Sequence, residues 1–317
     1  MKIAVLFPGQ GSQFLGMGQE FVKENTASGA LMAMAEAACE INLGSLCADG
    51  PMEELTRATN LQPAITITNI ICWERFKEEL GGKVSVSYLA GHSLGEYSAL
   101  CAAGVVSVED TIRLVAKRGA LMEREGINNP GGMRAVLGLN IKTLDAIIDG
   151  YQGEGVVTTA NHNTPEQIVI SGSQAGLDGV SRLAEEKGAK VIPLNVSVAN
   201  HSPLVAAAIP DFAQFMADIE FKVPATPVYF NVSADLENDP LKIKDMMARQ
   251  IGSRVRWCEI IEAMLVNGVD TFIEVGPKTV LKGMMKKITP KGTKVTALQL
   301  DSPSTLRSCI EHINKEQ

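Results

Sequence analysis

The chain has 317 residues, of which 45% are hydrophobic and 21% are charged, so it is long enough to bury a full core as one large domain or two smaller ones. Its formal net charge is −7 and it contains no basic aromatic motif of a DNA- or RNA-binding protein, which argues against a nucleic-acid partner. The four histidines and six cysteines form no close ligand set such as CxxC or HExxH, so no metal site is predicted.

The apolar runs and the cysteines indicate where the protein works. The N-terminal sequence MKIAVLFPGQ has only a short apolar run before Pro8, too short for the core of a signal peptide. No run approaches the ~18 apolar residues of a membrane span, and scattered cysteines are typical of free thiols in a reducing compartment. We therefore expect a cytoplasmic protein with no membrane segment and, because no dimerisation signal is evident, a monomer.

The first elements alternate between buried strands and helices. Residues 2–7 (KIAVLF) predict a strand buried on both faces, and the loop PGQGSQ follows it. Helices are predicted over 30–41 and 64–80, a strand over 84–90, and a helix over 94–104. Ser107 and Asp110 resemble a capping box, which predicts a further helix from there to about Glu125. This order is typical of an α/β fold.

The pattern changes at INNPGG, residues 127–132. The order strand, helix, strand, strand, helix, strand follows over about 70 residues and ends at AKVIPLNVS, which is the split βαβ order of a ferredoxin-like unit. We expect residues 128–198 to form an inserted ferredoxin-like subdomain. Residues 1–127 and 199–317 would form the surrounding α/β body, with further strands at 226–233, 270–276 and 293–300.

The segment GHSLG, residues 91–95, lies between the strand 84–90 and the helix 94–104. The pattern G-x-S-x-G in this context is typical of a nucleophile elbow, in which glycines allow close packing around a strained serine. The helix N-terminus supplies free N–H groups, of which that of Leu94 would stabilise an oxyanion. The pattern predicts that Ser93 is a catalytic nucleophile; the alternative is a structural turn.

A serine nucleophile requires a base. His201 lies in VANHSPL, where the inserted unit returns to the body, and it is the preferred candidate. His162 is the competitor, His92 is predicted to be a packed or supporting group next to Ser93, and His312 lies in a charged tail. No nearby acid is marked as the group that orients the histidine, and a backbone carbonyl could do so.

Arg118 has apolar neighbours on the predicted helix, at positions 114, 115, 121 and 122. A buried guanidinium needs a partner, and arginine forms two-pronged bonds with carboxylates. The pattern leaves two interpretations open: a structural ion pair or snorkelling side chain, or a residue that holds a carboxylate of the substrate.

Five segments in this order resemble the malonyl-CoA:acyl carrier protein transacylases: FPGQGSQ (7–13), GHSLGEYSAL (91–100), KRGALM (117–122), NH (200–201) and EVGPKTVL (274–281). The resemblance covers nearly the whole chain. It implies an α/β-hydrolase-like large subdomain with an inserted ferredoxin-like small subdomain, and an active site between the two.

The resemblance also implies a role for each matching residue. Ser93 would carry the acyl group, His201 would be its base and acid, and Arg118 would bind the malonyl carboxylate. Gln10 would supply the second oxyanion N–H beside Leu94, and the main chain of Gln250 would orient the histidine, which would explain the missing acid. Malonyl-CoA would donate to the phosphopantetheine thiol of acyl carrier protein by ping-pong acyl transfer, without a further cofactor, in fatty acid synthesis.

Two positions depart from the family pattern, Arg134 in MRAV and Asn200 in VANH, and both lie near the acyl pocket in the family. They leave open a choice between malonyl and branched malonyl groups. Loading of polyketide carrier proteins is an alternative pathway, and a serine thioesterase or carboxylesterase is the rival activity, although that class usually keeps an acid between the serine and a late histidine.

Residues 278–294 hold six lysines and no acid. The pattern leaves two interpretations open: a solvated surface face, or a surface that steers the acidic carrier protein electrostatically.

Overall fold

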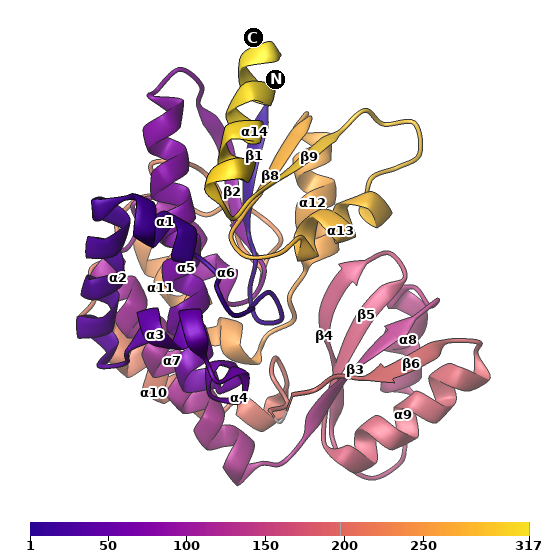
Figure 1. Cartoon of the computed structure of the whole chain (residues 1–317). Helices are drawn as coiled ribbons and strands as arrows, with labels where there is room; N and C mark the ends of the chain where they lie inside the picture. Colours follow the sequence, from indigo (N-terminus) through magenta and orange to yellow (C-terminus); the bar gives the residue numbers. More distant parts are fainter. Residues whose placement is uncertain (197, 317) are drawn as a thin grey trace.

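A computed structural model describes residues 1–196 and 198–316 (Figure 1). Ser197, at the end of the predicted strand AKVIPLNVS, and Gln317 lie outside the described residues. A body built around one sheet carries both chain ends, and a smaller unit with its own sheet lies beside it (Figure 1). Among the described residues, no single helix is long and apolar enough to cross a membrane, although the bent pair Thr26–Cys39 and Leu43–Asp49 meets that test by length and composition.

The body sheet has the strand order β7-β2-β1-β8-β9 with parallel neighbours. Its strands are β1 (Ile3–Phe7), β2 (Val86–Gly91), β7 (Val228–Tyr229), β8 (Thr271–Val275) and β9 (Thr296–Leu300). Every residue of β1 and β8 is buried, as expected for central strands of a parallel sheet that is covered on both faces. The predicted strand over 2–7 is therefore confirmed.

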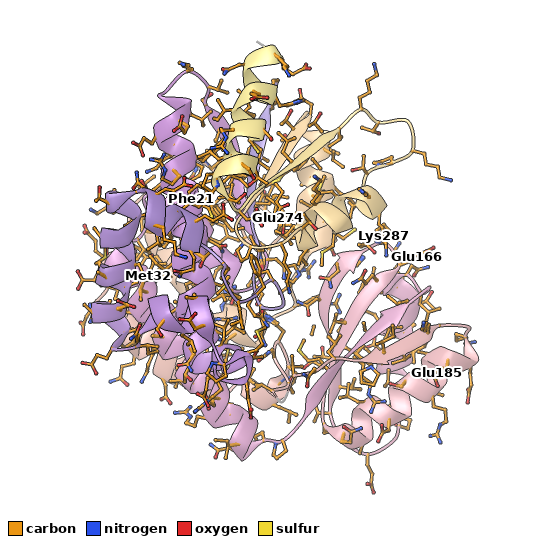
Figure 2. All side chains as sticks on the ribbon, viewed as in Figure 1. Phe21, Met32, Glu166, Glu185, Glu274 and Lys287 are labelled. Atoms are coloured by element: carbon orange, nitrogen blue, oxygen red, sulfur yellow. The ribbon has the colours of Figure 1, made fainter. Side chains whose placement is uncertain are left out.

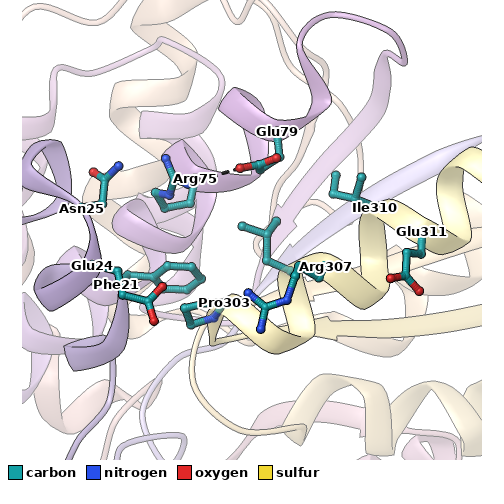
Figure 3. Close-up of a pocket in the computed structure, with 10 residues that line it drawn as sticks. Phe21, Glu24, Asn25, Arg75, Glu79, Pro303, Arg307, Ile310 and Glu311 are labelled. Carbon is teal, nitrogen blue, oxygen red and sulfur yellow. Dashed lines mark hydrogen bonds and ion pairs between the residues drawn. The ribbon is translucent and has the colours of Figure 1, made fainter.

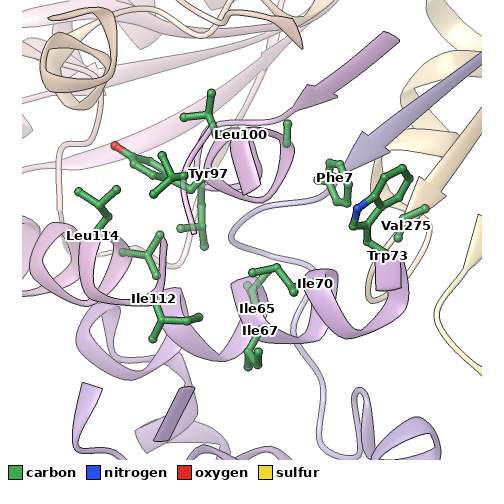
Figure 4. Close-up of a cluster of buried hydrophobic side chains, with 14 of the residues drawn as sticks. Phe7, Ile65, Ile67, Ile70, Trp73, Tyr97, Leu100, Ile112, Leu114 and Val275 are labelled. Carbon is green, nitrogen blue, oxygen red and sulfur yellow. The ribbon is translucent and has the colours of Figure 1, made fainter. Parts of the chain in front are cut away.

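Helices cover the body sheet, and one part of its core lies where β1 meets the helices α5 (Ala58–Leu80), α6 (Gly95–Ala102) and α7 (Val108–Asn128) (Figure 4). The figure shows Phe7 and Trp73 in contact range near Val275, with the isoleucines of α5 below them. The helices of the body are α1 (Gln19–Glu24), α2 (Thr26–Cys39), α3 (Leu43–Asp49), α4 (Met52–Thr56), α5 (Ala58–Leu80), α6 (Gly95–Ala102), α7 (Val108–Asn128), α10 (Ala208–Ala217), α11 (Pro240–Arg249), α12 (Trp257–Val266), α13 (Val280–Ile288) and α14 (Pro303–Lys315).

Some predicted boundaries were wrong for local reasons. The helix expected over 64–80 begins at Ala58, so Pro63 lies inside α5 rather than before it. The helix expected over 30–41 begins at Thr26, because the side chain of Asn25 accepts a hydrogen bond from the Ser28 N–H and caps it. The strand expected over 226–233 is only β7, since the Phe230 N–H turns to bond the carbonyl of residue 235. Ser107 caps α7 as predicted.

The smaller unit contains β3 (Gly132–Leu137), α8 (Ile141–Asp149), β4 (Val157–Thr164), β5 (Gln167–Gly172), α9 (Gln174–Glu186) and β6 (Lys190–Pro193). This is the element order that the sequence predicts. Its sheet has the order β4-β5-β3-β6 with antiparallel neighbours. α8 and α9 pack on one face of it, and Met133, Ala160 and Val169 form a separate apolar cluster on the other.

The edge strand β4 joins the unit to the body. The Val255 N–H donates to the Ala160 carbonyl, and the His162 N–H donates to the Val255 carbonyl. Arg254 adds a two-pronged ion pair with Asp145, at 3.0 and 2.7 Å. The contact fixes the apolar face of the small sheet against the carboxyl ends of the body strands.

Candidate active site

Ser93 lies in the turn between β2 and α6, with a φ of 50° in the left-handed region that strains a non-glycine residue. The turn can be tight because glycines at positions 91 and 95 have no Cβ to clash with the neighbouring backbone. A Cβ on Gly91 would lie 1.9 Å from the carbonyl carbon of Gly95, and a Cβ on Gly95 would lie 2.0 Å from the carbonyl oxygen of Phe7. The predicted strand, strained turn and helix around Ser93 are therefore present.

Replacing Gly95 with alanine is expected to destabilise the fold by at least about 3 kcal/mol, since the added methyl group meets backbone atoms that cannot move aside. Thermal unfolding measures this. Gly283→Ala in α13 is the matched control: no atom lies within 4 Å of the added carbon, and a helical alanine should gain roughly 0.5–1 kcal/mol. Similar melting temperatures for Gly95→Ala and the unaltered protein would contradict the tight-turn account.

His201 contacts the serine directly. The Nε2 atom of His201 lies 2.8 Å from the Ser93 Oγ. On the other side of the ring, Nδ1 lies 3.1 Å from the Gln250 carbonyl oxygen and 2.9 Å from that of Ser253. Carbonyl oxygens only accept, so Nδ1 holds the proton and Nε2 is free to accept the hydrogen of Ser93. Two main-chain carbonyls thus orient the histidine, in place of the carboxylate for which the sequence offered no candidate.

The imidazole is kept neutral by its surroundings. Burial, followed by the positive charge of Arg118, lowers the pKa of His201 to about 3. A neutral ring at physiological pH can act as a general base. His92 plays no direct part in this pair: its Nε2 lies 2.8 Å from the Asn163 Oδ1, and its ring meets Trp257 edge to face, which fits the predicted supporting role.

Arg118 projects from α7 to the nucleophile and is almost fully buried. It donates through Nη1 to the Gln62 Oε1 at 3.0 Å, and through Nη2 to the Gln250 Oε1 at 3.1 Å and the Ser93 Oγ at 3.4 Å. Within the described residues, no carboxylate oxygen lies within 4.0 Å of this guanidinium, and its Nε has no hydrogen-bond partner. A buried cation held only by neutral acceptors is suited to receive an external carboxylate.

The sequence did not predict Asn231 and Glu96 behind the nucleophile, nor the role of the Gln250 side chain beside that of its main chain. The Asn231 Oδ1 accepts from the Ser93 N–H at 2.7 Å, and the Gln250 Nε2 donates to the Ser93 carbonyl at 2.8 Å. Glu96, on α6, accepts from both: its Oε1 from the Asn231 N–H and its Oε2 from the Gln250 Nε2, each at 2.7 Å. A signal was available for Glu96, an acid in the otherwise apolar run EYSALCAAG. Asn231 is far away in sequence and gave none.

Two backbone donors lie beside the serine at the cavity. The N–H groups of Leu94, at the start of α6, and of Gln10, in the loop after β1, have no acceptor within residues 1–196 and 198–316. Both residues line the same cavity as Ser93. Unpaired N–H groups beside a nucleophile can stabilise a negative oxygen during acyl transfer.

The cavity that holds these groups has a volume of about 180 Å³ and lies between the body and the smaller unit. The body supplies the polar groups, and the smaller unit and α13 supply most of the apolar wall, which includes Met133, Val169, Leu194, Val196, Leu281 and Met284. A larger cavity of about 390 Å³ lies between α1, α5 and α14 (Figure 3). It holds none of the predicted site residues, and its two arginines are interspersed with acids.

The histidine that competed for the role of base is placed elsewhere. His162 lies on β4 between Asn161 and Asn163, which both line the cavity, but it does not line the cavity itself. Its Nδ1 lies 3.0 Å from the Glu259 Oε2 on α12. Among the described residues, no group of three His, Cys, Asp or Glu side chains is arranged to hold a metal ion.

Comparison with known proteins agrees with this geometry. Residues 5–299 match the family model described as acyl transferase domain. The malonyl CoA-acyl carrier protein transacylase of Bacillus subtilis (strain 168) is 41% identical over 317 residues, covering 99% of this chain and 98% of that protein. The chain belongs to the malonyl CoA-acyl carrier protein transacylase family.

Solved structures of the family superpose closely. The acyl carrier protein S-malonyltransferase of Vibrio cholerae is 37% identical with a TM-score of 0.91, covering 98% of this chain and 100% of that one. A malonyl-transacylase in complex with a type II PKS acyl-carrier protein is 33% identical with a TM-score of 0.92, again covering 98% and 100%. The resemblance drawn from five sequence segments is therefore confirmed, and the chain is an acyltransferase.

One of the two departures from the family pattern was misjudged. Arg134 does not face the acyl pocket: it pairs with Asp178 on α9 and donates to the Ser181 Oγ at 3.0 Å. Side chains alternate along β3, so Met133 lines the cavity and Arg134 points away. Asn200 does line the cavity, where its buried Oδ1 has no partner among the described residues.

Proposed function

We propose that the chain transfers a malonyl group from malonyl-CoA to the phosphopantetheine thiol of acyl carrier protein, for fatty acid synthesis, through a malonyl ester on Ser93. The observation that carries this proposal is the site itself: a serine 2.8 Å from a neutral histidine, with a buried arginine 3.4 Å from the same oxygen. The names of the relatives support the same reaction.

In the first half-reaction, His201 Nε2 takes the proton of the Ser93 hydroxyl as its oxygen attacks the thioester carbon. The Leu94 and Gln10 N–H groups stabilise the oxyanion. The carbon–sulfur bond then breaks, and the proton on His201 passes to the sulfur of coenzyme A. The malonyl carboxylate binds the guanidinium of Arg118, whose Nε has no partner among the described residues, and this holds the ester in one pose.

In the second half-reaction, the thiol of the carrier protein gives its proton to His201 and attacks the ester carbon. The bond to the Ser93 oxygen breaks, and His201 returns the proton to the serine. The Gln250 and Ser253 carbonyls keep the ring oriented through both steps. We propose that no cofactor takes part beyond the two thiol substrates.

Release of coenzyme A tests this proposal against the rival hydrolase. With malonyl-CoA and no carrier protein, the transferase should release one equivalent of coenzyme A per active site and then stop. Adding phosphopantetheinylated carrier protein should restart release. Continuous release of coenzyme A and free malonate without a carrier would overturn the proposal in favour of a thioesterase.

We propose that residues 1–127 and 199–317 form an α/β-hydrolase-like subdomain and residues 128–198 an inserted ferredoxin-like one. The elbow at the end of a parallel strand supports the first assignment, and the strand order β4-β5-β3-β6 with antiparallel neighbours supports the second. The cytoplasmic location and the monomeric state stay predictions.

We propose that the lysine strip, residues 278–294, is the docking surface for the carrier protein. α13 runs through this strip and presents Leu281 and Met284 to the active-site cavity. Its other face carries Lys286 and Lys287 to solvent, and Figure 2 shows Lys287 on the side of the body toward the smaller unit. A basic surface at the rim of the cavity would attract an acidic partner and guide its thiol arm inward.

Reversal of charge at Lys282 and Lys286, to glutamate, should raise the KM for carrier protein roughly tenfold and leave the KM for malonyl-CoA unchanged. Steady-state kinetics with each substrate varied in turn measures this. The exposed Lys23 and Lys315, away from the cavity, are the matched control pair. An unchanged KM for carrier protein at low salt would show that the lysine strip is a solvated surface with no role in docking.

Polyketide carrier proteins are a second candidate acceptor. The observation that favours them is the related structure in complex with a type II PKS acyl-carrier protein. The kcat/KM values for a fatty acid carrier and a polyketide carrier, measured side by side, decide between them, and our proposal requires the first to be the larger.

A further inference from the structure

Glu96 is a buried acid that the proposed reaction does not use. It lies in the first turn of α6, three residues after the nucleophile, and is 1% exposed. Its two oxygens accept one hydrogen bond each, from the Asn231 N–H and from the Gln250 Nε2. Both partners are themselves buried and both reach the nucleophile.

These two partners hold the strained backbone of Ser93 from both sides. The Asn231 side chain accepts from the Ser93 N–H, and the Gln250 side chain donates to the Ser93 carbonyl. Asn231 also donates to the Gly91 carbonyl at 2.8 Å, on the other side of the turn. A residue with positive φ persists only where its surroundings fix it, and here both restraints lead back to one carboxylate.

The same carboxylate is linked to the arginine through an amide. The Arg118 Nη2 donates to the Gln250 Oε1, and the Gln250 Nε2 donates to the Glu96 Oε2. An amide between a cation and an anion is polarised in the direction that strengthens both bonds. Glu96 thereby balances the charge of Arg118 without occupying the face that a substrate would use.

We propose that Glu96 is a positioning residue of malonyl transfer, one buried carboxylate that holds the backbone of Ser93 and the guanidinium of Arg118 in a single arrangement. This inference rests on the proposed function and deepens it. Because both Glu96 partners are donors, the arrangement favours the ionised carboxylate: a proton on either oxygen would weaken that oxygen as an acceptor and point an O–H donor at an N–H group.

The surroundings make this ionisation sensitive to pH. Burial raises the pKa of Glu96 to about 7, opposed by the bonds from Asn231 and Gln250 and by Arg118. The titratable groups that face it are the Arg118 guanidinium from α7 and the Tyr97 phenol from α6, while the other two segments present amides. Since His201 stays neutral far below this range, we expect malonylation to slow as the pH falls below about 7. Burial also raises the pKa of Glu274, behind α13, to about 7, so only a loss of rate that disappears in Glu96→Gln is assigned to Glu96.

The test compares the rate of Ser93 acylation by malonyl-CoA and by acetyl-CoA, followed by intact mass, in the unaltered protein, Glu96→Gln, Glu96→Asp and the control Glu125→Gln. Glu125 is also buried and accepts from local partners, but it does not line the cavity. In Glu96→Gln, an amide N–H must face one of the two donors. We expect roughly 100-fold slower malonylation and a roughly tenfold lower preference for malonyl over acetyl.

Glu96→Asp should recover part of both quantities, and Glu125→Gln should keep the preference of the unaltered protein. The fall in the malonylation rate below about pH 7 should be absent in Glu96→Gln. Equal slowing of both donors with an unchanged pH profile would show a merely structural role and overturn the inference, as would a rate equal to that of the unaltered protein. If Glu96→Gln does not fold, malonylation by the unaltered protein that stays constant from about pH 8 to about pH 5 overturns it. Failure of the unaltered protein to accept malonyl at any pH would instead overturn the proposed function.

Discussion

The Ser93→Ala variant is expected to carry no covalent malonyl group after incubation with malonyl-CoA and to transfer malonyl at least about 10⁴-fold more slowly. No other hydroxyl in the site is held 2.8 Å from a histidine nitrogen among the described residues. His201→Ala should show a loss of similar size, because the serine then has no base. Intact mass of the protein and the rate of carrier loading measure the two effects.

The His312→Ala variant is the matched control, since that histidine lies near the end of α14, outside the cavity. It should load malonyl at the rate of the unaltered protein. Full malonylation of Ser93→Ala would show that another residue is the nucleophile and would remove the basis of the account.

Replacing Arg118 with alanine is expected to lower malonyl transfer by roughly 10²–10⁴-fold, because breaking a buried charge pair costs about 3–5 kcal/mol. The acetyl group has no carboxylate, so its slow transfer should change far less. The preference for malonyl over acetyl should therefore collapse. Competition between the two donors, read by intact mass, measures the preference directly.

Arg118→Lys separates charge from geometry. Lysine keeps the positive charge but cannot form the two-pronged bond or reach both Gln62 and Gln250, so it should restore only a small part of the preference. A preference that survives in Arg118→Ala would mean that the arginine has a structural role and that another group binds the carboxylate.

Features that depend on residues close together in the sequence could be predicted from it. The run KIAVLF is apolar throughout because β1 is buried on both faces, and the glycines around Ser93 are required by contacts within the turn itself. The βαββαβ order of residues 128–198 followed from hydrophobic periodicity. Arg118 was marked by its apolar neighbours on α7, and the structure places it at the nucleophile.

Features that depend on contacts between residues far apart in the sequence could not be predicted. Asn231 reaches Ser93 across 138 residues of sequence, and the Ser253 carbonyl reaches His201 across 52. Successive side chains of β3 point to opposite faces of the sheet, and here Met133 rather than Arg134 faces the cavity. Which of the two faces the cavity depends on the register of β3 with β5, which no local sequence pattern gives. Glu96 is recognisable in the sequence as an acid next to the nucleophile motif. Its role is not, because its partners Asn231 and Gln250 come from two distant segments.

In the proposed mechanism an acyl group rests on Ser93 between the two half-reactions, and a chase of its mass from enzyme to carrier detects it. The unaltered protein is incubated with malonyl-CoA, freed of small molecules, weighed intact, and then mixed with phosphopantetheinylated acyl carrier protein. We expect the enzyme to gain the mass of one malonyl group, which peptide mapping places on Ser93, and to lose that mass as it appears on the carrier. An enzyme that never gains the mass while the carrier still becomes malonylated would contradict the covalent mechanism.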